Sequence, residues 1–495
     1  MSDVQPFGLV VLLSSLAVLL AVLSNRLTER LRVPAPALFF VAAAAAARLV
    51  PHLRPQERTV ERVVTVALLV ILLDGGAGIG WRRFRAAAAP IALTGVLGTF
   101  LTAGGLALVA HLVLGTGAYL SLLIGTALSP TDPAVVFSVL GQREVQGRSG
   151  TVLEGESGAN DPVSIALLAG LLAAGGVSGG AALQVGGEFA LQMAVGVAVG
   201  VIGGRALLEL VRRVPLPGEG LYPLRAIAGA LALYGVATLL HGSGFLAVFV
   251  AGVVLGDPGA PYKREVQRFS SALASLGEVV AFVVLGLTVD LGVLLRADVL
   301  LPGIVLFVAM ALVVRPLLLG LCLWPVALTR GERGFVLLAG LKGAVPVLLG
   351  SFLLAAHVPQ AERLYGVVVV VVVLSVVLQG GLVPSLAHWL SVPMTTSPVE
   401  PFAVGVRLAG EPEGVLRLQV HAGSQADGLP VRDLDDIAGE VWVSLVVRDR
   451  KLLGVRGSTL LAAGDEVVLL AADAQRALLR EALTRPKRKQ TELAP

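Results

Sequence analysis

The chain has 495 residues, of which 56% are hydrophobic and 15% charged, and its formal net charge at pH 7 is +4. An average soluble domain is about a quarter charged, so this composition excludes an ordinary soluble protein. The small net charge gives no reason to expect a nucleic-acid polymer as partner. The single cysteine, Cys322, excludes an intramolecular disulfide.

Long apolar stretches in residues 1–393 predict an all-α, polytopic membrane domain. Most of them are long enough to cross a bilayer, which takes about 20 residues. The first stretch is interpreted as a retained span and not as a signal peptide. The expected spans are 7–23, 35–50, 63–80, 90–113, 118–140, 152–175, 188–211, 223–240, 243–257, 272–295, 299–323, 333–356 and 364–390.

Basic residues gather in alternate loops between these spans. Arginines such as Arg26, Arg82, Arg143 and Arg212 follow odd-numbered spans, whereas the other loops are nearly neutral, apart from the one after the second span. Cytoplasmic loops of membrane proteins carry the excess of Lys and Arg. We therefore expect the N-terminus outside and the C-terminus in the cytoplasm.

Two of the expected spans are interrupted by helix-breaking residues. The interruptions are Ser129-Pro130-Thr131-Asp132-Pro133 and Gly340-Leu341-Lys342-Gly343-Ala344-Val345-Pro346. Proline lacks the N–H that a regular helix needs, so neither segment is expected to be a continuous helix. Broken helices at matching positions of two halves predict an inverted-repeat transporter with its site near the middle of the membrane.

A polar cluster opens the span at 152–175. It contains Glu156, Ser157, Asn160 and Asp161, and ionisable residues inside a membrane by default indicate an ion or proton site. Burial favours a protonated Asp161 and a bound cation favours an ionised one, so this group can hold either. Ser157 lies four residues earlier on the same helix face and offers a hard oxygen ligand. Asn160 is expected to orient its neighbours.

Four further residues are candidates, and Glu156 is interpreted as structural. Thr131 and Asp132 could ligate a cation beside freed backbone carbonyls, or cap a helix that faces a water-filled cavity. Asp74 could line a cytoplasmic funnel or cap a loop. Glu156 and Lys342 are expected to pair as a structural clamp, because an unpaired buried charge costs several kcal/mol; the alternative makes Lys342 a proton carrier.

Arg315, in the span at 299–323, is a further buried charge. It is expected to pair with a carboxylate of the preceding span, either Glu278 or Asp290, in a structural role.

The hydrophobicity ends at residue 393, and a short linker at 394–399 follows. Residues 400–475 alternate apolar and polar side chains, as in Val415–Val420, Val441–Val447 and Val467–Leu470. Alternation of period two predicts strands, and we expect a small cytoplasmic α/β domain. Residues 476–495 are expected to form a helix at 476–483 and then a basic tail, which lies on anionic lipid or is solvated.

Four segments together resemble the monovalent cation:proton antiporter superfamily. They are Thr131-Asp132-Pro133, Glu156–Asp161, His241–Gly252 and Gly340–Pro346, and their order along some 390 residues also agrees. The resemblance implies about thirteen helices in inverted repeats, a homodimer, and an elevator-like movement of a core domain. It makes Asp161 the exchanging carboxylate, with Thr131, Asp132 and Ser157 around the ion.

Two details of this resemblance bear on mechanism. The Asn160-Asp161 pair resembles the electroneutral branch of the superfamily. Lys342 stands where the family has an arginine that pairs with the glutamate, and lysine keeps the charge but lacks the bidentate fork.

The C-terminal region resembles the regulatory domain found at the C-terminus of potassium-conductance regulators, the TrkA-C or RCK-C type. The matching residues are Gly428–Leu434 and Val455–Val468. Such modules dimerise and bind small molecules or nucleotides. The combination looks most like bacterial potassium/proton antiporters.

The sequence therefore predicts a secondary antiporter of a bacterial inner membrane that exchanges K⁺, or Na⁺, for H⁺. It is expected to be electroneutral, regulated by its C-terminal domain, surrounded by lipid, without a cofactor, and not an enzyme. The alternatives are a Na⁺/H⁺ antiporter with little K⁺ transport, a ligand-gated cation channel, and a sensor that transports nothing.

Overall fold

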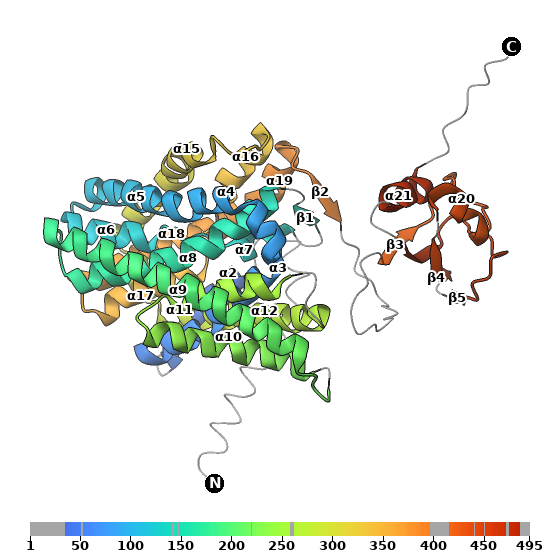
Figure 1. The fold of residues 1–495 in the computed structure, drawn as a ribbon. Helices are drawn as coiled ribbons and strands as arrows, with labels where there is room; N and C mark the ends of the chain where they lie inside the picture. Colours follow the sequence, from blue (N-terminus) through green and yellow to red (C-terminus); the bar gives the residue numbers. More distant parts are fainter. Residues whose placement is uncertain are drawn as a thin grey trace, which may run out of the picture. The chain divides into compact units, whose positions relative to one another are not determined.

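The structure is a computed structural model that describes residues 35–50, 53–140, 143–145, 148–218, 220–257, 262–396, 415–439, 441–449, 451–471 and 475–485. The chain divides into two compact units, Met1–Ala403 and Val404–Pro495. The first unit is built from helices, blue to orange in Figure 1, and the second from a small sheet with short helices, in red.

Apolar helices make up the first unit. Among the described residues, eight are long and apolar enough to cross a membrane, and four shorter apolar helices accompany them. The bounds are α2 (Ala35–Leu49), α3 (Glu57–Ala86), α4 (Ala88–Ala92), η2 (Leu93–Leu97), α5 (Gly98–Leu114), α6 (Ala118–Ala127), α7 (Pro133–Leu140), α8 (Arg148–Ala174), α9 (Gly179–Arg213), α10 (Leu221–Leu239), α11 (Gly244–Leu255), α12 (Lys263–Thr288), α13 (Leu291–Leu294), α14 (Ala297–Ala309), η3 (Met310–Leu319), α15 (Gly320–Leu323), α16 (Arg330–Leu338), α17 (Ala344–Ala355), α18 (Ala361–Leu374), η4 (Ser375–Gln379) and α19 (Gly380–Trp389).

These helices overlap the expected spans from 35–50 to 364–390. The expected span 7–23 lies outside the described residues, so a total of thirteen stays a prediction. Both expected interruptions are confirmed: one separates α6 from α7, and the other separates α16 from α17. The π-helical segments η2, η3 and η4 were not predicted. Pro316 lies inside η3, and its missing N–H is a reason for the wider turn there.

The long helix α8 lies at the centre of the helical unit. Figure 1 shows α4, α5, α15 and α16 along one side of it and α9 to α12 along the other. It packs against α3, α6, α9 and η2. Every residue of α8 from Glu156 to Val163 is buried, so the polar cluster lies inside the protein and not against lipid.

Two short strands join the end of the last helix to the connection between α7 and α8. β1 (Arg143–Val145) lies between α7 and α8 in the sequence, and β2 (Met394–Thr396) follows α19. They pair antiparallel, with Glu144 opposite Thr395. The segment expected as a linker at 394–399 therefore begins as a strand; residues 397–414 lie outside the described part of the chain.

The second unit is an antiparallel sheet in the order β3-β6-β4-β5. Its elements are β3 (Val415–Gln419), η5 (Val431–Leu434), α20 (Asp435–Ala438), β4 (Trp442–Arg448), β5 (Lys451–Leu453), β6 (Glu466–Leu470) and α21 (Arg476–Thr484). The strands predicted from the alternating pattern are confirmed, as is the helix that follows them. The apolar face of the sheet packs against α21, whose Leu479 and Leu483 are fully buried.

An arginine–carboxylate pair joins β4 to the start of β6. Arg448 donates through Nε to Asp465 Oδ1 at 2.7 Å and through Nη2 to Oδ2 at 2.8 Å. Burial by itself would raise the pKa of the Asp465 carboxyl, but the hydrogen bonds from Arg448 and from the backbone N–H of Ala462 lower the pKa overall.

Candidate functional site

The two breaks meet inside the helical unit and satisfy each other's backbone. The backbone N–H of Asp132, in the break between α6 and α7, donates to the carbonyl oxygen of Leu341 at 2.8 Å. Lys342 Nζ, in the break between α16 and α17, donates to the carbonyl oxygens of Ser129 at 3.0 Å and Pro130 at 2.9 Å. Irregular backbone is tolerated at membrane depth only where it is buried in protein or lines water.

Helix α8 holds the first break from the other side. Ser157 Oγ donates to the carbonyl oxygen of Thr131, and Asn160 Nδ2 donates to Thr131 Oγ1 at 2.8 Å. The backbone N–H of Thr131 faces Asn160 Oδ1 at 3.4 Å. A second link joins the hydroxyls of Ser129 and Ser164 at 2.8 Å. The structure thus brings Ser157 and Asn160 to Thr131, as the sequence predicted, and Asn160 holds the break in place.

Asp161 is buried without a hydrogen-bond partner for one of its oxygens. The residue is 7% exposed, and its Oδ1 has no partner. The charged groups whose fields act on it are Asp132 and Lys342. An ionised carboxylate in this setting lacks the hydrogen bonds that would replace water, which is costly. Uptake of a proton or a cation would therefore lower the free energy of the buried Asp161 carboxylate.

Asp132 occupies the space beside the second break. Its carboxyl group packs against Gly343, the N-cap residue of α17, where a Cβ atom would overlap the carboxyl oxygen. Only glycine fits there without displacing the side chain. The position of the Asp132 carboxyl is therefore fixed by a contact between the two breaks.

The expected clamp between Glu156 and Lys342 is wrong. Glu156 Oε1 instead pairs with Arg315 Nη2 at 2.9 Å, and both side chains are almost fully buried. Arg315 also donates to the carbonyl oxygens of Leu337 and Val336 at 3.0 and 3.1 Å. Its guanidinium group fills the space beside Gly340, where a Cβ would overlap it. The planar fork of arginine serves one carboxylate and two carbonyls at once, in a fixed geometry that the point-like ammonium of a lysine does not provide.

The partners expected for Arg315 are accordingly also wrong. Asp290, beyond the end of α12, pairs with Arg54 at 3.2 Å. Glu278 Oε1 is buried and has no hydrogen-bond partner.

Lys342 is fully buried and is held by a network that the sequence reading missed. Its ammonium lies at the carbonyl end of α6, where a cation is favoured. Its backbone N–H donates to Ser375 Oγ at 3.0 Å, and Ser375 Oγ donates to Gln379 Oε1 at 3.0 Å. Gln379 Nε2 donates to the carbonyl oxygen of Leu338 at 2.6 Å. A serine and a glutamine that follow a run of valines in a membrane span were the signal that could have revealed this network.

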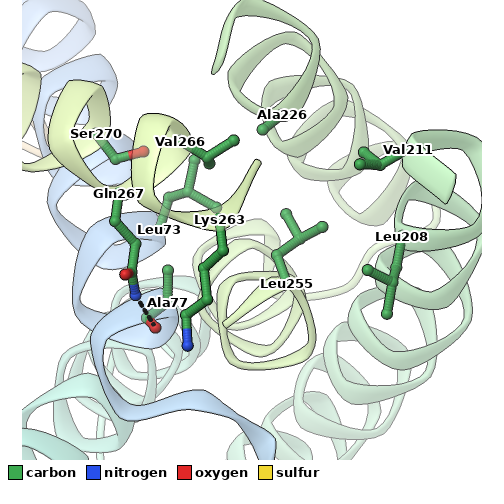
Figure 2. A pocket seen from close by; sticks show the side chains of 10 residues that line it. All are labelled: Leu73, Ala77, Leu208, Val211, Ala226, Leu255, Lys263, Val266, Gln267 and Ser270. Atoms are coloured by element: carbon green, nitrogen blue, oxygen red, sulfur yellow. Dashed lines mark hydrogen bonds between the residues drawn. The ribbon is translucent and has the colours of Figure 1, made fainter. Parts of the chain in front are cut away.

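Asp74 lies on α3, where its carboxylate accepts a hydrogen bond from Ser271 Oγ of α12 at 2.8 Å. Its hydrogen bond in the described part of the chain is therefore to α12, and not to the residues around Thr131. At the same level of α3, an apolar cavity of about 20 Å³ has Leu73, Ala77 and Gln267 in its lining (Figure 2). Its lining includes none of the residues of the two breaks.

Comparisons with known proteins identify relatives of this chain. Residues 15–389 match the family described as sodium/hydrogen exchanger, transmembrane. The chain is 37% identical over 341 residues to the K(+)/H(+) antiporter NhaP of Alkalimonas amylolytica; the match covers 68% of this chain and 58% of that one. It is 30% identical over 471 residues to the K(+)/H(+) antiporter NhaP2 of Shewanella sp. (strain MR-4), covering 93% and 81%.

A match with a solved structure extends to the fold. The sodium proton antiporter MjNhaP1 from Methanocaldococcus jannaschii aligns with a TM-score of 0.64 at 20% identity, over 77% of this chain and all of that one. The helical unit therefore has the fold of that antiporter.

Proposed function

Because the chain belongs to the sodium/hydrogen exchanger family, we propose that it exchanges a monovalent cation for a proton across a membrane at Asp161. The family consists of transporters, so the chain is a multi-pass membrane transporter and not an enzyme. The observation that carries the proposal is the unpartnered Oδ1 of the buried Asp161, beside the crossing of two broken helices.

The chemistry of exchange follows from this one carboxylate. In a site shielded from water, a bound proton neutralises Asp161 and removes its attraction for a cation, whereas a bound cation favours the ionised form. The two substrates then occupy the site in turn. Asp132, Thr131 and Ser157 supply further oxygens beside Asp161, of the type that hard cations accept.

We infer that K⁺ is the preferred cation and that the exchange is electroneutral. Support for K⁺ comes from the relatives in Alkalimonas and Shewanella, which are named K(+)/H(+) antiporters. A shorter match, 28% identical over 203 residues, is to a low-affinity Na(+)/H(+) antiporter of Synechocystis, so a Na⁺/H⁺ exchanger is the second candidate. One-for-one exchange rests on the neutral Asn160 beside Asp161.

We place this exchange in a bacterial inner membrane, with the C-terminal unit in the cytoplasm as a regulatory domain of the RCK-C type. The arginine-rich loops after alternate spans support that orientation. The exchanger would act as a homodimer, alternately opening Asp161 to each side of the membrane.

The test is transport by the full-length protein in everted membrane vesicles. We expect K⁺ to dissipate an imposed pH gradient with the wild type, and the rate to fall at least 100-fold in Asp161→Asn, because an amide can bind neither a proton nor a cation in the same way. A lower KM for K⁺ at higher pH is also expected, since protons compete less.

The control is Glu209→Gln, which removes an exposed carboxylate of α9 that pairs with Arg213; it should transport like the wild type. Undiminished exchange by Asp161→Asn would refute the proposal. Transport of Na⁺ but not K⁺ would favour the second candidate, and cation flux that ignores the proton gradient would indicate a channel.

A further inference from the structure

One face of α12 carries polar side chains over about half of its length. Gln267, Ser271 and Ser275 recur at intervals of four residues, and Glu278 follows three residues later. This spacing places all four on one side of the helix. Polar groups inside a membrane span face the protein interior or a water-filled cavity, so the face indicates a hydrated path.

The polar face of α12 lies along α3. Gln267 Nε2 donates to the carbonyl oxygen of Ala77 at 3.0 Å (Figure 2). One turn further, Ser271 Oγ donates to Asp74 Oδ1 at 2.8 Å. The side chains of Ser271 and Ser275 are also exposed. Asp74, which the sequence assigned to a cytoplasmic funnel or a loop cap, thus contacts this face of α12 from α3.

The polar face ends at Glu278. The next two residues on the same side of α12 are Phe282 and Leu285, which are 1% and 0% exposed. The side chains before Glu278 are polar and those after it form a closed apolar core. The path along α12 is therefore open toward the Lys263 end of the helix and sealed toward the Thr288 end.

Glu278 is a carboxylate with no hydrogen-bond partner in the described part of the chain. Its Oε1 is buried and unsatisfied, which is costly for an ionised group away from water. Helix packing brings this end of the polar face toward the broken helices, because α12 packs against α17, and the N-cap residue of α17, Gly343, contacts the Asp132 carboxyl.

We propose that Glu278 attracts the cation to the inner end of this polar face and passes it to Asp132 and Asp161. The inference rests on the proposed exchange of a monovalent alkali cation. To that exchange it adds an access path and the residue at which the path ends. A cation beside Glu278 would relieve the uncompensated charge of that carboxylate, whose Oε1 is buried without a hydrogen-bond partner in the described part of the chain.

The experiment compares KM and maximal rate for K⁺ in proteoliposomes of the full-length protein. Removing the charge in Glu278→Gln should raise the KM about tenfold, equivalent to about 1.4 kcal/mol of lost attraction. The maximal rate should stay within about twofold, because Asp161 is intact. Glu278→Asp keeps the charge and should stay within about threefold of the wild-type KM.

Glu265→Gln is the matched control, because Glu265 lies in the first turn of the same helix, away from the polar face; its KM should not change. An unchanged KM in Glu278→Gln overturns the inference, as does an equal loss of maximal rate in both Glu278 variants without a change in KM. Absence of exchange in the wild type would instead refute the proposed function itself.

A second test does not depend on the folding of a Glu278 variant. The chain has one cysteine, so Ser275→Cys in a Cys322→Ser background gives a single reactive site on the polar face. A positively charged methanethiosulfonate reagent should raise the KM for K⁺ several-fold, whereas a neutral reagent of similar size should not. Equal effects of the two reagents would contradict an electrostatic path along this face.

Discussion

The two broken helices have the same architecture but different chemistry. The first break, between α6 and α7, contributes carbonyl oxygens and the acid Asp132. The second, between α16 and α17, contributes the cation Lys342 and two glycines. Arg315 packs against Gly340, and Asp132 packs against Gly343. A long helix follows each break: α8 braces the first, and α18 with η4 braces the second.

The surroundings of the two breaks differ in how many buried polar atoms they leave without a hydrogen-bond partner. Among the described residues, three buried side-chain oxygens near the first break have no hydrogen-bond partner, on Thr126, Glu156 and Asp161. Around the second break, Ser375 and Gln379 both form hydrogen bonds. Because unsatisfied buried groups are costly, they persist mainly where function needs them. Under the proposed exchange, this difference makes the first break the one that binds the ion and the second break its support.

The largest effect should come from removing the charge of the second break. Lys342→Met would leave the carbonyl oxygens of Ser129 and Pro130 unpaired and would leave Asp161 without its nearby positive field. A buried acceptor left without its donor costs about 1–3 kcal/mol, and two carbonyl oxygens lose theirs here. We expect K⁺-dependent exchange to fall at least 100-fold, measured in proteoliposomes at matched protein content.

Lys342→Arg is the companion variant, because it keeps the charge; it should retain exchange within about tenfold of the wild type. If the methionine variant exchanged K⁺ at the wild-type rate, the second break would not support the site through its charge.

A smaller effect is expected from filling the contact between the breaks. Gly343→Ala places a methyl group where the Asp132 carboxyl lies, so that carboxyl must move. Overpacking of this kind costs about 1–3 kcal/mol. We expect a loss of exchange of about tenfold and a lower thermal midpoint of the purified protein.

The control for this substitution is Gly186→Ala in α9, where the added methyl group meets open space. It should leave both quantities unchanged. A Gly343→Ala protein with normal exchange would show that the position of Asp132 is not critical.

The sequence predicted the breaks because proline and glycine act locally. Pro130 and Pro133 cannot continue a helix, whatever packs around them. The approach of Ser157 and Asn160 to Thr131 was also predictable, because both lie on the helix that follows the first break. The strands of the second unit were predictable for the same reason, since alternation is a property of neighbouring residues.

The pairing of the buried charges was not predictable in this way. Glu156, Arg315 and Lys342 are far apart in the sequence, and each lies in an apolar span, so the pattern does not decide which two meet. The π-helical turn around Arg315 shifts the register of its helix, and nothing in the apolar pattern marks that shift. The strand pair β1–β2 was missed because three-residue strands are too short to show alternation.

The smallest effect should come from removing a hydrogen bond that supports the second break. Ser375→Ala removes the acceptor for the backbone N–H of Lys342 and the donor to Gln379. A buried N–H left unpaired costs about 1–3 kcal/mol, so the thermal midpoint should fall by a few degrees while exchange stays within about threefold. Ser351→Ala is the matched control, because that hydroxyl bonds only within its own helix, to Leu348. If Ser375→Ala instead abolished exchange without lowering the thermal midpoint, the second break would take part in ion binding. The division between a binding break and a supporting break would then be wrong.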